Sequence, residues 1–213
     1  MNQQLFKLTD HDGRTYNRTQ WGAGVTHGPL SGTGDLCGPG YFHAYLSPEL
    51  SIFLNPQYSN FKYPILWEAN GEIVRYDQQL KVGCRTLTTI RQLPDVKITP
   101  EHRMRFGILC ATAVYKDHGF YEWATGWLSG NDQTPEAAKA MKKALERAFE
   151  CRGRPPPPER NAAGWAAWNA TRMVCEQEST GWGRGPACAA SFAAHANPDL
   201  DLINLASSVV ANQ

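Results

Sequence analysis

A chain of 213 residues with 42% apolar and 19% charged side chains has an ordinary globular composition and is long enough to bury a core. Its formal net charge of +1 provides no overall field that would recruit nucleic acid or an anionic membrane. No apolar run reaches the roughly 18 residues of a membrane-spanning helix, and the first residues lack the apolar core of a signal peptide. We expect a soluble, cytoplasmic protein without a membrane partner.

The first 96 residues are predicted to form a β-rich domain. Residues 5–9 alternate like a strand and precede a turn at Asp12-Gly13, from which residues 15–21 return. Residues 22–40 are rich in glycine and predict a long loop, and residues 41–45 form a short aromatic strand. A short helix begins at Ser47-Pro48-Glu49 and stops at Asn55-Pro56.

The β-rich domain ends with further strands. Residues 65–69 and 72–75 flank Asn70-Gly71, a dipeptide that favours a tight hairpin turn. Residues 81–84 and 87–93 are two more predicted strands.

Residues 97–213 are predicted to be helical. Thr99-Pro100-Glu101 and Thr134-Pro135-Glu136 each join a cap, a proline and an acid in the order that begins a helix. Further helices rich in alanine and tryptophan follow a break at the four prolines 155–158. The predicted fold is α+β: a small, mostly antiparallel sheet with a short helix, followed by a helical half. The alanine-rich helices are too poor in large side chains for a core of their own, so we expect close packing on one another or on the sheet.

The candidate chemistry gathers around residues 38–47. Strand alternation places Tyr41, His43 and Tyr45 on one face, beside a glycine loop and a helix start that favours anions. The opposing interpretation of His43 is a half-buried side chain bonded to a backbone carbonyl. The candidate catalytic residues are His43, Tyr45 and Glu68, and the candidate ligand-binding residues are Tyr41, Ser47, Gly38 and Gly40.

Glu68 lies in an apolar strand, so its carboxylate either faces outward or occupies a pocket with a raised pKa. Trp165, Trp168 and Trp182 are candidate partner-binding residues, because tryptophan is a preferred interface anchor; the alternative is that these rings fill gaps between alanine-rich helices. The six cysteines contain no Cys-x-x-Cys pair, and Cys37 with His43 has no second pair at metal-ligand spacing. We expect free thiols and no metal.

Several segments resemble a family of uncharacterised proteins of bacteriophages and their bacterial hosts. They are Gln20-Trp21-Gly22-Ala23-Gly24-Val25-Thr26-His27, Leu36-Cys37-Gly38-Pro39-Gly40-Tyr41-Phe42-His43-Ala44-Tyr45, Leu66-Trp67-Glu68-Ala69 and the run 81–90. The resemblance covers about residues 4–130 and implies a phage or prophage origin. The absence of a convergent catalytic motif and the tryptophan- and alanine-rich helical half favour an accessory protein that binds a host protein or protein complex, for example one of a host defence system, without a cofactor.

A local resemblance suggests an enzyme instead. Gly38-Pro39-Gly40-Tyr41-Phe42, followed by a capped short helix, is similar to the segment that frames the nicotinamide pocket of ADP-ribosyltransferases. That resemblance implies NAD as a cosubstrate, with His27 as the upstream histidine and Glu68 or Glu72 as the catalytic glutamate. The binding protein and the ADP-ribosyltransferase-like enzyme are the two functional hypotheses.

Overall fold

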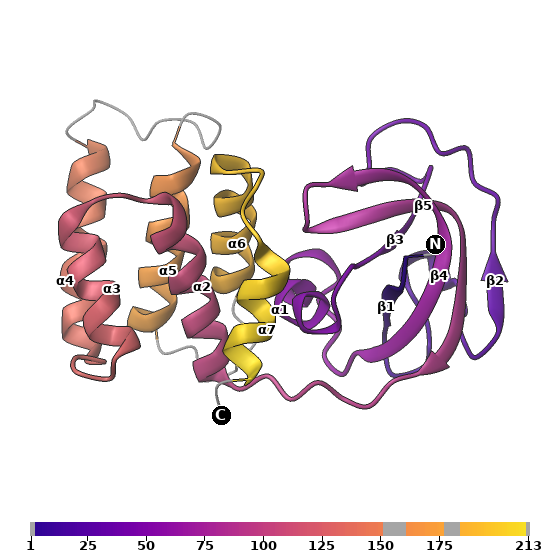
Figure 1. Ribbon diagram of the computed structural model, residues 1–213, viewed down its shortest axis with the longest axis horizontal. Coiled ribbons are helices and arrows are strands. Elements are labelled where there is room, and N and C mark those ends of the chain that lie inside the picture. The colour runs from indigo at the N-terminus through magenta and orange to yellow at the C-terminus, as the bar shows by residue number, and fades with distance from the viewer. Residues whose placement is uncertain (1–2, 151–160, 177–183, 212–213) are drawn as a thin grey trace. The chain divides into compact units, whose positions relative to one another are not determined.

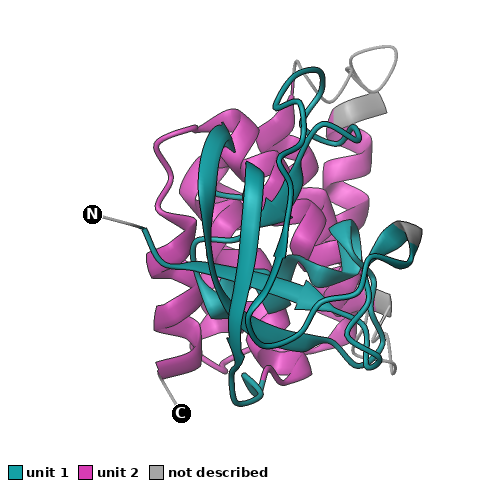
Figure 2. Ribbon diagram, turned by 90° about the vertical axis from the view of Figure 1, so that its right-hand side faces the viewer, with its two compact units in different colours: residues 1–97 teal, residues 98–213 magenta. Residues whose placement is uncertain are grey.

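A computed structural model describes residues 3–150, 161–176 and 184–211 of the chain. The chain forms two compact units, Met1–Lys97 and Ile98–Gln213, which Figure 2 colours separately. This division lies next to the boundary expected between residues 96 and 97. The proline run at 155–158 lies outside the described residues. The predicted α+β class, with a small antiparallel sheet and a short helix before a helical half, is confirmed.

The first unit is built from an antiparallel sheet and one α-helix (Figure 1). Its elements are β1 (Leu5–Thr9), the 3-10 turn η1 (Tyr16–Arg18), β2 (Val25–His27), β3 (Phe42–Ala44), α1 (Pro48–Tyr58), β4 (Ile65–Asp77) and β5 (Lys81–Gln92). The loop predicted over residues 22–40 therefore contains a short strand, because β2 pairs with β5 at the register Val25 to Thr89.

The strand pairings of this unit close on themselves. β1 pairs with β4, β4 with β5, and β5 with β3. Phe6 and Tyr45 then exchange two backbone hydrogen bonds, of 2.9 and 2.8 Å, which join β1 to the residue after β3. The result is a small barrel, and its long strands β4 and β5 are strongly curved in Figure 1. Its interior is filled by one cluster of buried side chains: Leu5, Trp21, Ala44, Ala69, Val82, Cys84 and Leu87.

The hairpin turn predicted at Asn70-Gly71 is wrong. Both residues lie inside β4 and pair with Thr88 and Leu87 of β5, so β4 continues through them to Asp77. The turn lies instead at residues 77–81, where Gln78 has a φ of 49°. The two strands predicted over residues 81–93 are correspondingly one strand, β5. Long-range pairing with β5 outweighs the local turn preference of Asn-Gly.

Gly71 is required in the barrel for a reason other than turn formation. It lies beside an irregularity in the β4–β5 register, where a Cβ atom would overlap the carbonyl oxygen of Thr86 and approach Leu87 Cδ1 to 3.0 Å. This overlap is with backbone, which cannot rotate away, so β5 would have to shift.

We expect Gly71→Ala to lower the free energy of unfolding by about 1–3 kcal/mol, the usual cost of overpacking. Asn70→Ala, one residue away, should cost less than about 1 kcal/mol. Denaturant titration of both variants checks this contrast, and equal losses would contradict the steric explanation.

The start of α1 follows the prediction, and its end does not. Ser47 Oγ accepts a hydrogen bond from the backbone N–H of Leu50 at 3.2 Å, as an N-cap does. The helix nevertheless passes Asn55-Pro56 and ends at Tyr58. The Asn55 side chain forms two hydrogen bonds with the backbone of Phe61, of 2.9 and 3.1 Å, and so organises the chain beyond the helix.

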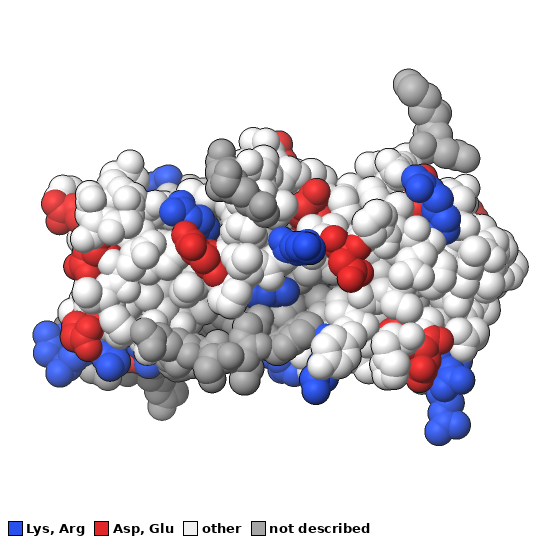
Figure 3. All heavy atoms as spheres, turned by 90° about the horizontal axis from the view of Figure 1, so that it is seen from below, with Lys and Arg blue, Asp and Glu red and all other residues white. Residues whose placement is uncertain are grey.

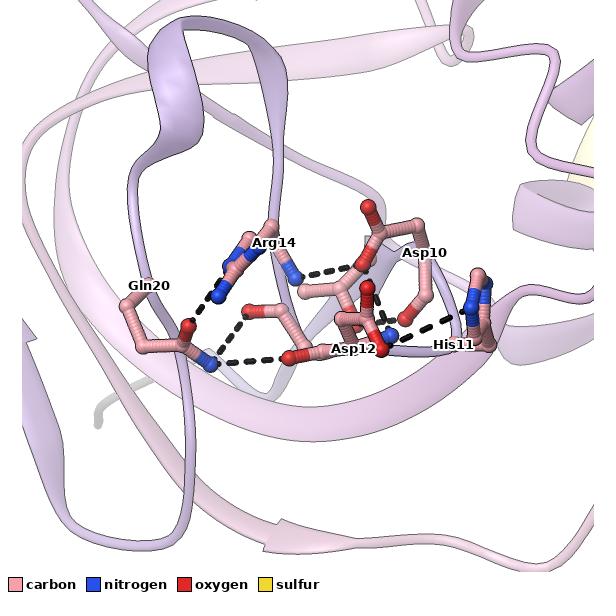
Figure 4. A network of polar contacts seen from close by, with 7 residues as sticks. Asp10, His11, Asp12, Arg14 and Gln20 are labelled. Atoms are coloured by element: carbon pink, nitrogen blue, oxygen red, sulfur yellow. Dashed lines mark hydrogen bonds and ion pairs between the residues drawn. The ribbon is translucent and has the colours of Figure 1, made fainter.

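The segment after β1 is fixed by the polar network of Figure 4. Asp10 Oδ1 accepts hydrogen bonds from the backbone N–H groups of Asp12 and Arg14, at 2.9 and 2.7 Å. Gln20 accepts from Arg14 Nε at 3.1 Å and donates to the carbonyl of Asp12 at 2.9 Å. Gly13 has the φ of 75° that the predicted turn needs, but residues 15–21 return as a 3-10 turn rather than as a strand. The network brings the chain back so that Trp21 enters the barrel.

The second unit consists of helices that pack on one another: α2 (Pro100–Val114), α3 (His118–Leu128), α4 (Pro135–Glu150), α5 (Ala162–Glu176), α6 (Gly185–Ala196) and α7 (Leu202–Ala211). In Figure 1, α5 lies between α4 and α6. Thr99 caps α2 as predicted, and the backbone N–H of Thr99 donates in return to His102 Nδ1. The last helix begins at Leu202.

The large side chains of this core come mainly from α2 and α3. Phe106, Ile108 and Phe120 are fully buried, and Trp127 is 2% exposed. The alanine-rich helices α5 and α6 pack on each other and on α2, in agreement with the expectation that they pack closely and have too few large side chains for a core of their own.

Candidate functional site

His43 lies on β3 and forms hydrogen bonds through both its ring and its backbone carbonyl. Its Nε2 donates a short hydrogen bond to the carbonyl oxygen of Leu36, and its own carbonyl accepts one from Lys7 Nζ at 2.8 Å. Burial lowers the pKa of His43 below its ordinary value; the Leu36 carbonyl opposes this shift, and the charges of Lys7 and Lys81 add to it. At neutral pH the ring is therefore uncharged, and its contact is the one foreseen in the half-buried interpretation.

The two tyrosines of the predicted face are covered. Tyr41 is 7% exposed, and its hydroxyl donates to the carbonyl of Gly34 at 3.3 Å. Tyr45 is 3% exposed, and burial raises its pKa to about 12, although its hydroxyl is hydrogen bonded to Ser59. Both rings thus support the segments that lie over β3.

The predicted anion site at the helix start is occupied by the chain itself. Ser47 is 3% exposed, caps α1, and donates to Glu49 Oε2 at 2.7 Å. A carboxylate of the protein therefore already lies at this end of the helix.

Gly38 and Gly40, the two glycines predicted to bind a ligand, lie in the tightly folded loop before β3. Gly38 N–H donates to the carbonyl of Asp35 at 2.7 Å, and the carbonyl of Gly40 accepts from Gly32 at 3.0 Å. A side chain at Gly40 would overlap the carbonyl oxygen of Thr33.

The structure does not bring Glu68 to His43. Glu68 Oε2 accepts a hydrogen bond from Arg91 Nε at 2.6 Å, and Oε1 accepts one from Gln4 at 3.1 Å. Glu68 pairs with Arg91 near the end of β5, whereas His43 pairs with Gly83 near its start. Eight residues of strand separate the two positions, or about 26 Å along β5. The three residues proposed as catalytic do not form one constellation.

Two lysines that sequence reasoning missed lie close to His43. Lys7 is 7% exposed, lies 5.1 Å above the Trp21 ring, and donates to the His43 carbonyl. Lys81 is 3% exposed, lies 4.3 Å above the Tyr58 ring, and donates to Cys37 Sγ at 3.1 Å. Lys7 stands between apolar residues of β1, which is a sequence signal that sets it apart, whereas β5 contains several other polar residues and gives Lys81 no such signal.

A tryptophan pair forms the second candidate site, on α5. Trp165 and Trp168 are both half-buried and contact each other edge to face, with ring centroids 5.6 Å apart. Two cations flank the Trp168 ring, Lys142 Nζ at 5.8 Å and the Arg172 guanidinium at 5.5 Å. We call these four residues the tryptophan face. Trp182, the third predicted partner-binding residue, lies outside the described residues.

Known protein families, curated proteins and solved structures contain no match to this chain. The case for a function therefore depends on the chemistry of the two candidate sites.

The charged side chains of the described residues form no patch of a single sign on the face that Figure 3 presents. Positive and negative side chains are interspersed there. Within residues 3–150, 161–176 and 184–211, no group of three or more His, Cys, Asp or Glu side chains is placed to hold a metal ion. No helix in this part of the chain has the length and apolarity to cross a membrane. Cys37, Cys84, Cys110 and Cys188 are free thiols.

Proposed function

We propose that the protein acts by binding another protein through the tryptophan face of α5. The observation that carries this proposal is the half-buried Trp168 ring between two cationic side chains. Tryptophan and arginine are the residues most enriched among those that dominate interface energies. The resemblance to bacteriophage and prophage proteins makes a protein of the bacterial host the expected class of partner.

The local contacts support a preformed binding surface. Trp168 Nε1 donates to Glu146 Oε1 at 3.3 Å, and Glu146 also pairs with Lys142 at 3.9 Å. Trp165 packs against Phe192 of α6, with ring centroids 6.0 Å apart. The indole of Trp168 is therefore oriented before any partner arrives, so binding loses little side-chain entropy. A partner with an apolar side chain flanked by carboxylates would complement this surface.

The test compares proteins retained from a bacterial lysate by the immobilised full-length chain and by its Trp168→Ala variant. We expect at least one protein to bind the unchanged chain and to lose roughly tenfold or more of its retention with Trp168→Ala, as for a residue that dominates an interface. Trp168→Phe keeps a ring but loses the indole N–H, so it should give an intermediate loss.

Tyr121→Ala is the matched control, because Tyr121 is an aromatic residue of the same unit with 60% exposure. It should retain the same proteins as the unchanged chain. Circular dichroism establishes that each variant is folded. Equal retention of every bound protein by Trp168→Ala and Tyr121→Ala would refute the proposed surface.

A further inference from the structure

Cys37 and Lys81 form a thiol–ammonium pair on β5 and the segment before β3. Lys81 Nζ lies 3.1 Å from Cys37 Sγ. The cysteine is exposed, whereas the lysine is 3% exposed. A reagent in solvent can therefore reach the sulfur, while the neighbouring ammonium group is held in place below it.

The surroundings of Lys81 direct its charge to the sulfur. Its ammonium lies 4.3 Å above the Tyr58 ring, and no carboxylate among the described residues forms an ion pair with it. The single described hydrogen-bond acceptor of this buried group is Cys37 Sγ. A buried cation without an anionic partner is costly, and a thiolate at this position would supply one.

The backbone holds the two groups together. The carbonyl of Leu36, next to Cys37, accepts the hydrogen bond from His43 Nε2. Gly83, two residues after Lys81, leaves room for the Leu36 side chain, which a Cβ atom there would overlap. The approach of Cys37 to Lys81 is thus built into the packing on both sides of the pair.

The other described cysteines are less exposed than Cys37. Burial raises the pKa of Cys84 to about 11 and raises that of Cys110 further still, so both remain thiols. Burial also raises the pKa of Cys188. Cys37 is the exposed thiol that has an ammonium group at hydrogen-bond distance.

We propose that Cys37 and Lys81 form a redox modification site that hydrogen peroxide converts into a covalent sulfur–nitrogen cross-link. The Cys37 thiolate attacks one peroxide oxygen, the O–O bond breaks, and Lys81 gives a proton to the departing hydroxide. This step yields a sulfenic acid, one water and a neutral Lys81 amine. The amine then attacks the sulfur, the S–O bond breaks, and a second water leaves. One peroxide is reduced to two waters, and the sulfur is oxidised by two electrons.

The site is tested by exposing the full-length chain to hydrogen peroxide, blocking the remaining thiols with iodoacetamide, and mapping peptides by mass spectrometry. We expect the peptide that contains Cys37 to be joined to the one that contains Lys81, lighter by two hydrogen atoms than the two together. A thiol reductant should separate them. Because a disulfide between Cys37 and Cys84, three residues after Lys81, would join the same peptides with the same mass change, the experiment is repeated with Cys84→Ala.

Lys81→Gln should abolish the joined peptide, because the amine that attacks the sulfur is gone. Lys62→Gln is the matched control, because Lys62 also lies over a tyrosine ring, at 5.3 Å from that of Tyr63. It should behave as the unchanged chain. If Lys81→Gln does not fold, the peroxide experiment on the unchanged chain still decides the test. Oxidation of its Cys37 to sulfinic acid without any joined peptide, or failure of peroxide to modify Cys37, would overturn the proposal.

Discussion

When Lys7 is replaced by Met, the difference in free energy of unfolding between the variant and the unchanged chain should change by about 3 kcal/mol between pH 7 and pH 11. Burial lowers the pKa of Lys7 from 10.5 to about 8, with the Cys84 thiolate acting weakly in the opposite direction. Between these two values the unfolded chain binds a proton that the folded chain does not. The free energy of unfolding of the unchanged chain therefore gains a contribution that rises with pH, by about 1.4 kcal/mol for each pH unit.

Lys7→Met removes this contribution while keeping an unbranched side chain inside the barrel. Relative to the unchanged chain, the free energy of unfolding of Lys7→Met should be highest at pH 7. That excess should vanish as the pH rises from 8 to 10.5. Comparing the two proteins at each pH cancels the ionisation of Tyr45, whose raised pKa of about 12 lowers stability at high pH. Denaturant titrations between pH 7 and pH 11 measure the difference. A difference independent of pH would show that Lys7 is solvated in the folded state.

Trp21→Ala should lower the free energy of unfolding of the first unit by about 3–5 kcal/mol. Trp21 is 2% exposed inside the barrel and packs edge to face against Phe42, with ring centroids 5.6 Å apart. Its Nε1 donates to Thr15 Oγ1 at 3.0 Å, and its ring lies below the Lys7 ammonium. The substitution removes the side chain that fills this part of the barrel, its hydrogen bond to Thr15, and the ring that faces the Lys7 ammonium.

Trp21→Phe separates these effects, because it keeps most of the apolar volume and an aromatic face. We expect it to cost about 1–2 kcal/mol, from the lost indole N–H and the weaker cation–ring attraction. Thermal or denaturant unfolding followed by circular dichroism measures both variants. Losses of the same size for Ala and Phe would show that the hydrogen bond to Thr15, and not the filling of the barrel, is what Trp21 provides.

Local signals in the sequence were sufficient where neighbouring residues decide the structure. Ser47 and Thr99 cap their helices as predicted, because a cap hydrogen bond spans three residues. The hairpin turn predicted at Asn70-Gly71 was wrong because the conformation of these residues is decided by pairing with Thr88 and Leu87, which are distant in sequence. The closure of the barrel through Phe6 and Tyr45 likewise has no local signature.

The candidate sites show the same limit. The sequence singled out His43 as a half-buried side chain or a base, but the carbonyl of Leu36 that holds it is identified only in the fold. Lys81 and Cys37 are 44 residues apart, and neither belongs to a motif that would pair them. Glu68 and His43 lie on two strands that both pair with β5, yet the register places them beside opposite ends of β5. Alternation along a strand predicts which face a residue occupies, but not which residue faces it.

The closure of the barrel has a consequence for the behaviour of the protein at high concentration. An open sheet presents unpaired N–H and C=O groups at its borders, which other molecules can extend into intermolecular sheets. Here the hydrogen bonds between Phe6 and Tyr45 occupy groups that would otherwise lie at such a border. β2 is a border strand of only three residues, and Pro29, two residues beyond it, has no N–H to offer. The first unit therefore presents a poor template for the sheet-to-sheet association that leads to fibrous aggregates.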